Sequence, residues 1–177
     1  MIFTPAGLGA VTLVDIDPRE DERGFFARTY CREEFTGAGL ANLGEQCSLS
    51  FNHRAGTLRG MHYQVAPVTE AKLVRCSAGA VLDQVVDLQP DSPTYLQSFA
   101  VELTADNRTA LYVPAMFAHG FQVLADRTEV AYQMSEAQRQ GSARGLRHDD
   151  PALGLSWPLP VAVISDADRN WALLPDP

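Results

Sequence analysis

Short runs of apolar, β-branched and aromatic residues recur along the chain, and residues that favour turns separate them. Nine runs of this kind are AVTLVDI, GFFARTY, EQCSLSF, AKLVRCS, AVLDQVVDL, SFAVEL, ALYVP, GFQVLA and TEVAYQM. Many short strands at this spacing are typical of an all-β sandwich or barrel. Within AVLDQVVDL the alternation of apolar and polar positions is clear at both ends and slips in the middle.

The remaining segments add little regular structure. Only CREEFTGAGL has the pattern of a helix, and Gly37 and Gly39 are expected to end it early. After Pro151 the chain is irregular and rich in proline. Because there is no internal repeat, linker or low-complexity tract, we expect one domain over residues 1–177, with the tail packed onto the barrel.

Composition narrows the possible partners. The chain has 177 residues, 46% of them hydrophobic, so it can bury one sizeable core. Its net charge of −8 disfavours nucleic acid and anionic membranes. Neither a secretory signal nor a run of membrane-spanning length is present, which predicts a cytoplasmic protein without membrane association. The three cysteines are far apart, as expected for reduced thiols.

Two segments concentrate polar groups where a barrel wall would favour alternation, LRGMHYQVAPVTEAKLVRC and LYVPAMFAHGF. In a jelly roll the mouth between the two sheets is a ready ligand cavity. His62 and His119 are expected to face each other across it. A small anionic ligand would need only two or three cations there, and Arg23, Arg59 and Lys72 lie among the strand-like runs.

The chemistry of His62 has three alternatives, namely a metal ligand, a proton carrier and a core side chain. Barrels that bind a transition metal usually present at least three His or carboxylate ligands, often with two histidines two residues apart on one strand. Here His62 is followed by Tyr63 and Gln64, so a metal site is disfavoured. The other two histidines, His53 and His148, lie in polar, turn-like contexts and are predicted to be surface residues.

Proton transfer is the next candidate, because imidazole titrates near neutral pH and a carboxylate can orient it. Asp168 in SDADR is the partner that we expect for His62, although spacing alone does not separate it from Asp166. A hydrogen-bonded core histidine remains the alternative for His62 and for His119.

The motifs of the chain resemble those of a known family. DERGFFARTY, TLRGMHYQ, AKLVRC, DLQPDSPTY, LYVPAMFAHGFQVL, EVAYQ, DDP followed by WP, and SDAD occur in the order seen in dTDP-4-dehydrorhamnose 3,5-epimerases, the sugar-nucleotide branch of the cupins. The resemblance covers nearly the whole chain, from Asp21 to Asp168. RGMHYQ together with FAHGF at this separation is its most specific part.

The resemblance implies a cupin-type jelly-roll (double-stranded β-helix) barrel with short helices and an irregular C-terminal tail. It implies a homodimer that uses no metal and no cofactor, and a nucleoside-diphosphate 4-keto-6-deoxy sugar as substrate. The C4 ketone acidifies the C3 and C5 hydrogens, so a base and an acid on opposite faces can invert a centre. His62 resembles the family's base and Asp168 its partner. Lys72 matches the lysine that stabilises the enolate, and Tyr132 matches the acid.

The resemblance also assigns a set of substrate-binding residues. Arg23 and Arg59 match the residues that hold the diphosphate, a task suited to guanidinium groups. In the dimer that the resemblance implies, GFFARTY reaches into the neighbouring pocket. The full set is Arg23, Phe26, Arg28, Gln46, Ser48, Arg59, His119 and Gln138.

Several positions depart from the family pattern. Arg28 stands where a glutamate is usual, and Ser48 where an asparagine is usual. Because arginine donates hydrogen bonds, Arg28 suits cytosine N3 better than thymine N3, which leaves the nucleotide base open. After Tyr132 the family has paired aromatic residues and a later glutamate, and this chain has Gln138 and Ala143 in those places. His148 stands before DDP, where the family has a tryptophan.

These departures keep other functions open. One is a mono-epimerase that inverts C3 or C5 alone, and another is a 3,4-ketoisomerase of a dTDP-sugar or a related nucleotide sugar. More distant alternatives are a metal-dependent cupin oxygenase and a sugar-nucleotide binding module without catalysis. The retained set of His62, Asp168, Lys72 and Tyr132 favours the epimerase, because binding alone would not require it.

Overall fold

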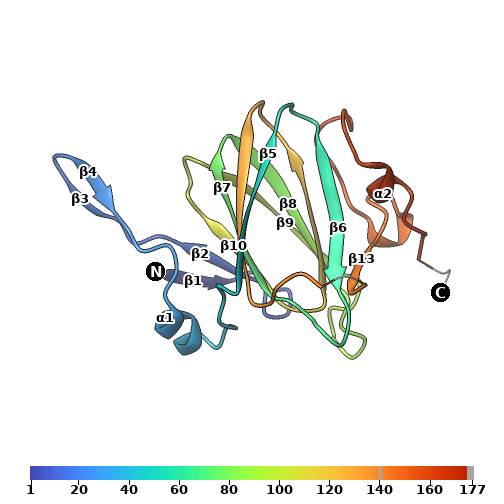
Figure 1. The fold of residues 1–177 in the computed structure, drawn as a ribbon, viewed down its shortest axis with the longest axis horizontal. Helices are drawn as coiled ribbons and strands as arrows, with labels where there is room; N and C mark the ends of the chain where they lie inside the picture. Colours follow the sequence, from blue (N-terminus) through green and yellow to red (C-terminus); the bar gives the residue numbers. More distant parts are fainter. Residues whose placement is uncertain (140, 175–177) are drawn as a thin grey trace.

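The structure is a computed structural model that describes residues 1–139 and 141–174. Two β-sheets pack face to face, and a thin hairpin projects from one end of the molecule (Figure 1). The elements in chain order are β1 (Ile2–Pro5), β2 (Thr12–Asp15), β3 (Arg19–Asp21), β4 (Gly24–Phe26), α1 (Arg32–Gly37), β5 (Gln46–Asn52), β6 (Leu58–Gln64), β7 (Lys72–Ala78), β8 (Ala80–Asp87), β9 (Ser98–Thr104), β10 (Ala110–Val113), β11 (Phe117–Val123), β12 (Thr128–Met134), β13 (Ala143–Gly145), a 3-10 turn (Pro151–Leu153) and α2 (Asp166–Arg169).

The strand order identifies the layers. One sheet has the order β1-β2-β10-β7-β12-β5, and the other has the order β13-β6-β11-β8-β9. Every pairing between neighbouring strands of these sheets is antiparallel. Strands β3 and β4 form a separate hairpin. The predicted all-β jelly roll is confirmed.

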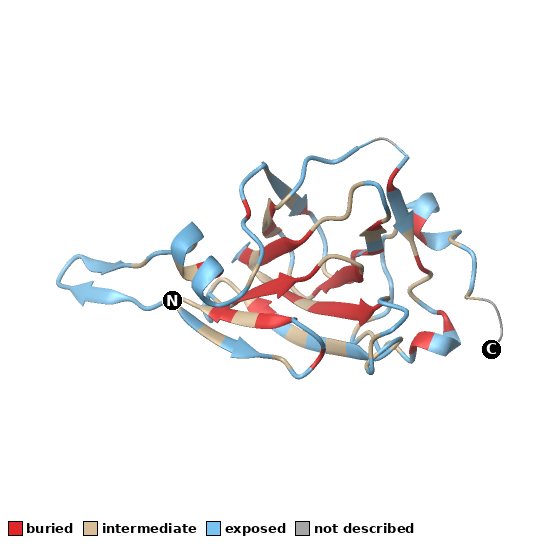
Figure 2. Cartoon of the chain, turned by 90° about the horizontal axis from the view of Figure 1, so that it is seen from below, coloured by how far each residue is buried: buried red, intermediate tan, exposed pale blue. Residues whose placement is uncertain are grey.

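The main core fills the space between the two sheets. Val74 and Val130 come from the six-stranded sheet, whereas Val85 and Phe121 come from the five-stranded sheet, and all four side chains are buried. In Figure 2 the buried segments follow the central strands, and the β3–β4 hairpin is exposed along its length. The apolar side chains of the alternating strand pattern therefore point into the space between the sheets.

Two further clusters cover the outside of the barrel. Phe35 of α1 packs against Val14 and Tyr112 on the six-stranded sheet. Leu153 in the C-terminal tail packs with Met61 and Ala118 of the five-stranded sheet. These contacts fix the tail against β6, the strand that carries His62.

Some elements differ from the sequence-based expectation. The helix in CREEFTGAGL ends at Gly37 as predicted, but the nine apolar runs did not include β1, β3, β6, β13 or α2. The prediction of a surface His148 was wrong, because this residue is only partly exposed and its Nδ1 is buried without a hydrogen-bond partner among the described residues. Over residues 1–139 and 141–174, no helix is long and apolar enough to cross a membrane.

Candidate active site

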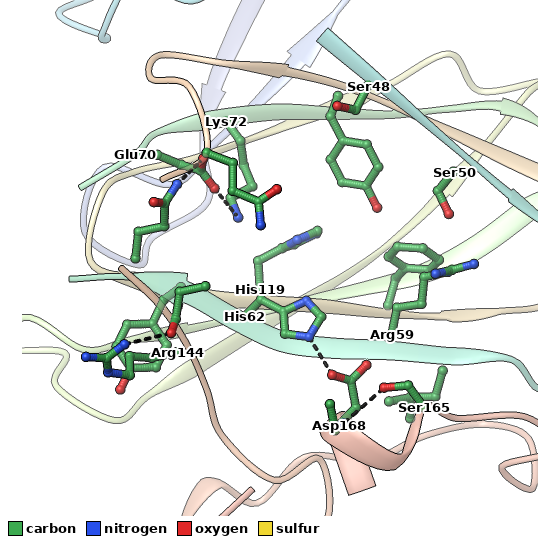
Figure 3. Close-up of a pocket in the computed structure, with 18 of the residues that line it drawn as sticks. Ser48, Ser50, Arg59, His62, Glu70, Lys72, His119, Arg144, Ser165 and Asp168 are labelled. Atoms are coloured by element: carbon green, nitrogen blue, oxygen red, sulfur yellow. Dashed lines mark hydrogen bonds and ion pairs between the residues drawn. The ribbon is translucent and has the colours of Figure 1, made fainter. Parts of the chain in front are cut away.

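A cavity of about 710 Å³ opens between the two sheets. Strand β6 supplies Arg59 and His62 to its wall, and the facing sheet supplies Lys72 from β7 and Tyr132 from β12. The side chains converge from opposite walls on the space around His62 (Figure 3). A ligand in the cavity is therefore contacted on two faces.

A β-bulge explains how Arg59 and His62 both reach the cavity. Residues three apart on a regular strand point to opposite faces. Here His62 pairs with His119 and Arg59 pairs with Phe121, so β6 has one residue more than β11 between these two pairs. Gly60 sits at the bulge with φ of 129°, and a Cβ atom there would lie 2.5 Å from the Gly120 Cα atom. The close approach of the two strands thus requires glycine at position 60.

The expectation that His62 and His119 face each other across the mouth was wrong. They are directly opposite partners on neighbouring strands of the same sheet, so their side chains lie next to each other on one wall. Tyr132 is the residue that faces them from the other sheet, and its ring centroid is 6.3 Å from that of His119.

His62 is paired with Asp168. The His62 Nε2 and Asp168 Oδ1 atoms are 2.6 Å apart, and the Gly60 N–H donates to the other carboxylate oxygen. Asp168 is on α2, where the side chain of Ser165 caps the helix, whereas Asp166 is exposed. The Asp168 side chain is 8% exposed, and that of His62 is 48% exposed where it lines the cavity. Asp168 thus holds the imidazole on one side, and the other side of the ring is open to the cavity.

The electrostatics of this pair favour an ionised carboxylate. Burial alone would raise the pKa of Asp168, but the hydrogen bond and charge of His62, with the Gly60 N–H, bring the pKa below its ordinary value. An ionised Asp168 accepts the hydrogen on Nε2, which leaves Nδ1 of a neutral His62 with its lone pair free for a ligand.

A second histidine–carboxylate pair lies beside the first. His119 Nε2 is 2.9 Å from Asp83 Oδ2, and both side chains are buried. The other Asp83 oxygen has no hydrogen-bond partner among the described residues. Burial of the Tyr132 phenol, followed by the charge of Asp83, raises its pKa, while Arg59 opposes this effect. The Tyr132 hydroxyl is therefore protonated at neutral pH.

Lys72 has its own acidic partner. The Lys72 Nζ atom lies 3.1 Å from Oε1 of Glu70, and the Gln64 side-chain amide donates to Oε2 of Glu70. Sequence reasoning missed Glu70 and Asp83. For Asp83 the available signal was a carboxylate in the middle of an apolar run, and for Glu70 it was an acid two residues before the lysine in TEAKL.

The expected binding residues divide into two groups. Gln46, Ser48, Arg59, His119 and Gln138 all line the cavity. The Arg59 Nε donates to Asn52, and the Gln138 N–H donates to the Gln46 side chain at 3.0 Å.

Arg23, Phe26 and Arg28 do not line the cavity of their own chain. Arg23 and Phe26 belong to the projecting hairpin, where Arg23 pairs with Asp21, and Phe26 is 80% exposed. Arg28 pairs with Glu34, which also accepts from the N-terminal ammonium group. The Arg28 guanidinium is thus engaged within its own chain.

Potential metal ligands are not clustered in the part of the chain that the structure describes. Among residues 1–139 and 141–174, no three His, Cys, Asp or Glu side chains are grouped in a way that could hold an ion. The groups that do converge in the cavity suit proton transfer and the binding of anionic groups.

Comparison with known proteins places this geometry in context. The profile of the dTDP-4-dehydrorhamnose 3,5-epimerase family matches residues 6–176. A dTDP-4-dehydrorhamnose 3,5-epimerase from Sinorhizobium fredii is 37% identical over 172 residues, which cover 96% of this chain and 88% of the relative.

Solved structures agree with these sequence matches. The crystal structure of a dTDP-4-dehydrorhamnose 3,5-epimerase from Elizabethkingia anophelis superposes with a TM-score of 0.93 at 32% identity, covering 98% of this chain and 96% of that one. A 3'-monoepimerase from Streptomyces bikiniensis, in complex with dTDP-quinovose, has a TM-score of 0.87 at 30% identity, covering 96% and 86% of the two chains.

Proposed function

Because the chain belongs to the dTDP-4-dehydrorhamnose 3,5-epimerase family, we propose that it inverts C3, C5 or both in a nucleoside-diphosphate 4-keto-6-deoxy sugar. It is an isomerase of deoxysugar biosynthesis. The reaction needs only side chains of the protein, because the C4 ketone makes the neighbouring C–H bonds acidic. The observation that carries the proposal is that His62 and Tyr132 line one cavity from opposite sheets.

In the proposed mechanism His62 is the base. Its Nδ1 removes a proton from the carbon next to the ketone, and Asp168 stabilises the imidazolium that forms. The electrons move into the C4 carbonyl, and the Lys72 ammonium stabilises the resulting enolate oxygen. Tyr132 then gives its hydroxyl proton to the opposite face of the carbon. Proton removal from one face and return to the other inverts the centre.

Nucleotide binding is proposed for the other end of the cavity. In Figure 3, Lys72 and Glu70 lie on one side of His62, and Arg59 and Ser50 lie on the other. We assign the sugar to the Lys72 side and the diphosphate to Arg59, whose guanidinium group suits phosphate oxygens. The dTDP-quinovose bound by the Streptomyces bikiniensis relative supports a nucleotide sugar as the ligand.

A homodimer completes the proposed site. Phe26 and Arg23 extend into solvent in the single chain, as expected of side chains that enter a partner's cavity. The outer face of the six-stranded sheet also suits a partner, because Leu49 is exposed there. Both terminal nitrogens of Arg75 on this face are buried without a hydrogen-bond partner among the described residues.

The three free thiols of the chain fit the reducing cytoplasm as the site of the reaction.

The second candidate function is that of a mono-epimerase, and the part of the cavity wall around Gln138 and Ala143 favours it. Gln138 and Ala143 line the cavity, and the alanine leaves the sugar less confined than a longer side chain would. A sugar that is held less firmly is expected to present only one of its two acidic carbons to His62.

Incubation with dTDP-4-keto-6-deoxyglucose in D2O, followed by NMR, tests both candidates. Deuterium at C3 and C5 indicates a 3,5-epimerase, and deuterium at one carbon alone indicates a mono-epimerase. His62→Ala should abolish exchange, whereas Tyr132→Phe should permit exchange and impair inversion. Wild-type turnover in His62→Ala would refute the mechanism. No exchange at either carbon in the wild-type protein, with this sugar linked to dTDP and with the same sugar linked to the cytosine nucleotide, would refute the function.

A further inference from the structure

Glu70 lies in the loop before β7 and bridges the two sheets at one end of the cavity. Its Oε1 atom is 3.1 Å from Nζ of Lys72 on the six-stranded sheet. Its Oε2 atom accepts a hydrogen bond from Gln64 on β6 of the five-stranded sheet. All three side chains line the cavity. The carboxylate is therefore fixed at both oxygens, by residues from opposite walls.

We propose that Glu70 is a positioning residue, which holds the Lys72 ammonium group at the reacting end of the cavity. The side chains of Lys72 and Glu70 are only 9% and 11% exposed. An ammonium group this far from water is costly unless an opposite charge and hydrogen bonds compensate it. Glu70 supplies the opposite charge at 3.1 Å, which holds the Lys72 side chain inside the cavity.

The geometry leaves Lys72 able to act on a ligand. An ammonium group has three hydrogens, and an ion pair with one carboxylate oxygen occupies at most one of them. The others remain for an oxygen atom in the cavity, which under the proposed function is the C4 oxygen that becomes negative in the enolate. Preorganised donors of this kind stabilise charge that develops during the reaction. Loss of Glu70 should therefore lower kcat more than it changes KM.

The inference rests on the proposed function for its catalytic part, and a double-mutant cycle tests it. The variants are Glu70→Gln, Lys72→Met and the double variant. Glu102→Gln is the matched control, because Glu102 is exposed on β9 and does not line the cavity. We expect Glu70→Gln to lower kcat roughly tenfold with KM changed by less than about twofold. In the Lys72→Met background the same change should lower kcat no further.

A second readout does not need the substrate. Thermal unfolding of the wild type and the same four variants should show a Tm about 3–10 °C lower for Glu70→Gln, because a lysine is left without its carboxylate. Lys72→Met should remove most of this sensitivity to the Glu70 change. Glu102→Gln should match wild type in both readouts.

The outcomes separate this inference from the proposed function. A wild-type protein that does not convert the sugar nucleotide refutes the function, and the unfolding cycle still decides whether Glu70 and Lys72 are coupled. Wild-type kcat in Glu70→Gln, with coupling seen only in Tm, makes Glu70 a structural residue and overturns the inference. Effects on kcat that add in the double variant also overturn it, because Glu70 then acts independently of Lys72.

Discussion

At the scale of single residues, the environment of Tyr132 sets its protonation state. Burial and the nearby Asp83 raise the phenol pKa above its ordinary value of 10.0, and a raised pKa extends the protonated range to higher pH. The acid role proposed for Tyr132 requires a protonated hydroxyl, and the raised pKa keeps it protonated throughout the neutral and moderately alkaline range.

This shift predicts a result in an alkaline titration followed by phenolate absorbance. Up to about pH 11, Tyr132→Phe should give the same absorbance change as wild type, because Tyr132 does not ionise there. The matched control is Tyr95→Phe, which removes a tyrosine that is 47% exposed. An equal loss of absorbance in the two variants would contradict the buried, protonated phenol.

Residue pairs show what the sequence predicts and what it leaves undecided. The motif order was enough to nominate His62 and a carboxylate in SDADR, but the choice of Asp168 over Asp166 depends on α2, which places only Asp168 against β6. Asp83 and Glu70 carry no motif that sequence reasoning recognised. Their importance comes from burial beside His119 and Lys72, which is a property of the folded chain.

At the scale of elements, the β6–β11 bulge is what assembles the site. Strand patterns predicted most strands of the two main sheets, because alternation follows directly from which face is buried. A bulge changes that alternation without leaving a clear apolar signal, so strand alternation alone does not place Arg59 and His62 on the same face. The short strands β1, β3 and β13 were missed since they bury few apolar residues.

Glycine substitutions test the close approach of strands at the bulge. Gly60 and Gly44 both have positive φ, 129° and 112°, but an added Cβ would meet Gly120 only at position 60. Both alanine variants carry backbone strain. We therefore expect Gly60→Ala to lower the free energy of unfolding by about 1–3 kcal/mol more than Gly44→Ala, as overpacking does. Urea denaturation measures this difference, and equal losses would mean that the strands separate without cost.

At the scale of the whole molecule, the projecting β3–β4 hairpin is the feature that one chain does not explain. All residues of its two strands are exposed. Arg23 and Phe26, to which the family resemblance gives a role in substrate binding, lie outside the cavity of their own chain. The sequence pattern alone predicts a strand there and says nothing of where the strand goes. The proposed homodimer would give these side chains a place beside a substrate.

Mixing two inactive variants tests this arrangement. In the first variant His62→Ala removes the proposed base, and in the second Arg23→Ala with Phe26→Ala removes the proposed hairpin contacts. In a mixed dimer, one cavity combines an intact His62 with the intact hairpin of the other chain, and its second cavity has both defects. After random exchange of subunits half of the dimers are mixed, so about one quarter of wild-type activity should return.

A mixture of His62→Ala with Lys72→Met provides the control for subunit exchange. Both changes affect groups that the cavity takes from its own chain, so every cavity in a mixed dimer keeps one defect and no activity should return. If the hairpin mixture also stays inactive while mass spectrometry shows mixed dimers, the hairpin does not complete the partner's cavity. If it regains activity and the control does not, the catalytic unit is the dimer, because each cavity then depends on side chains from two chains.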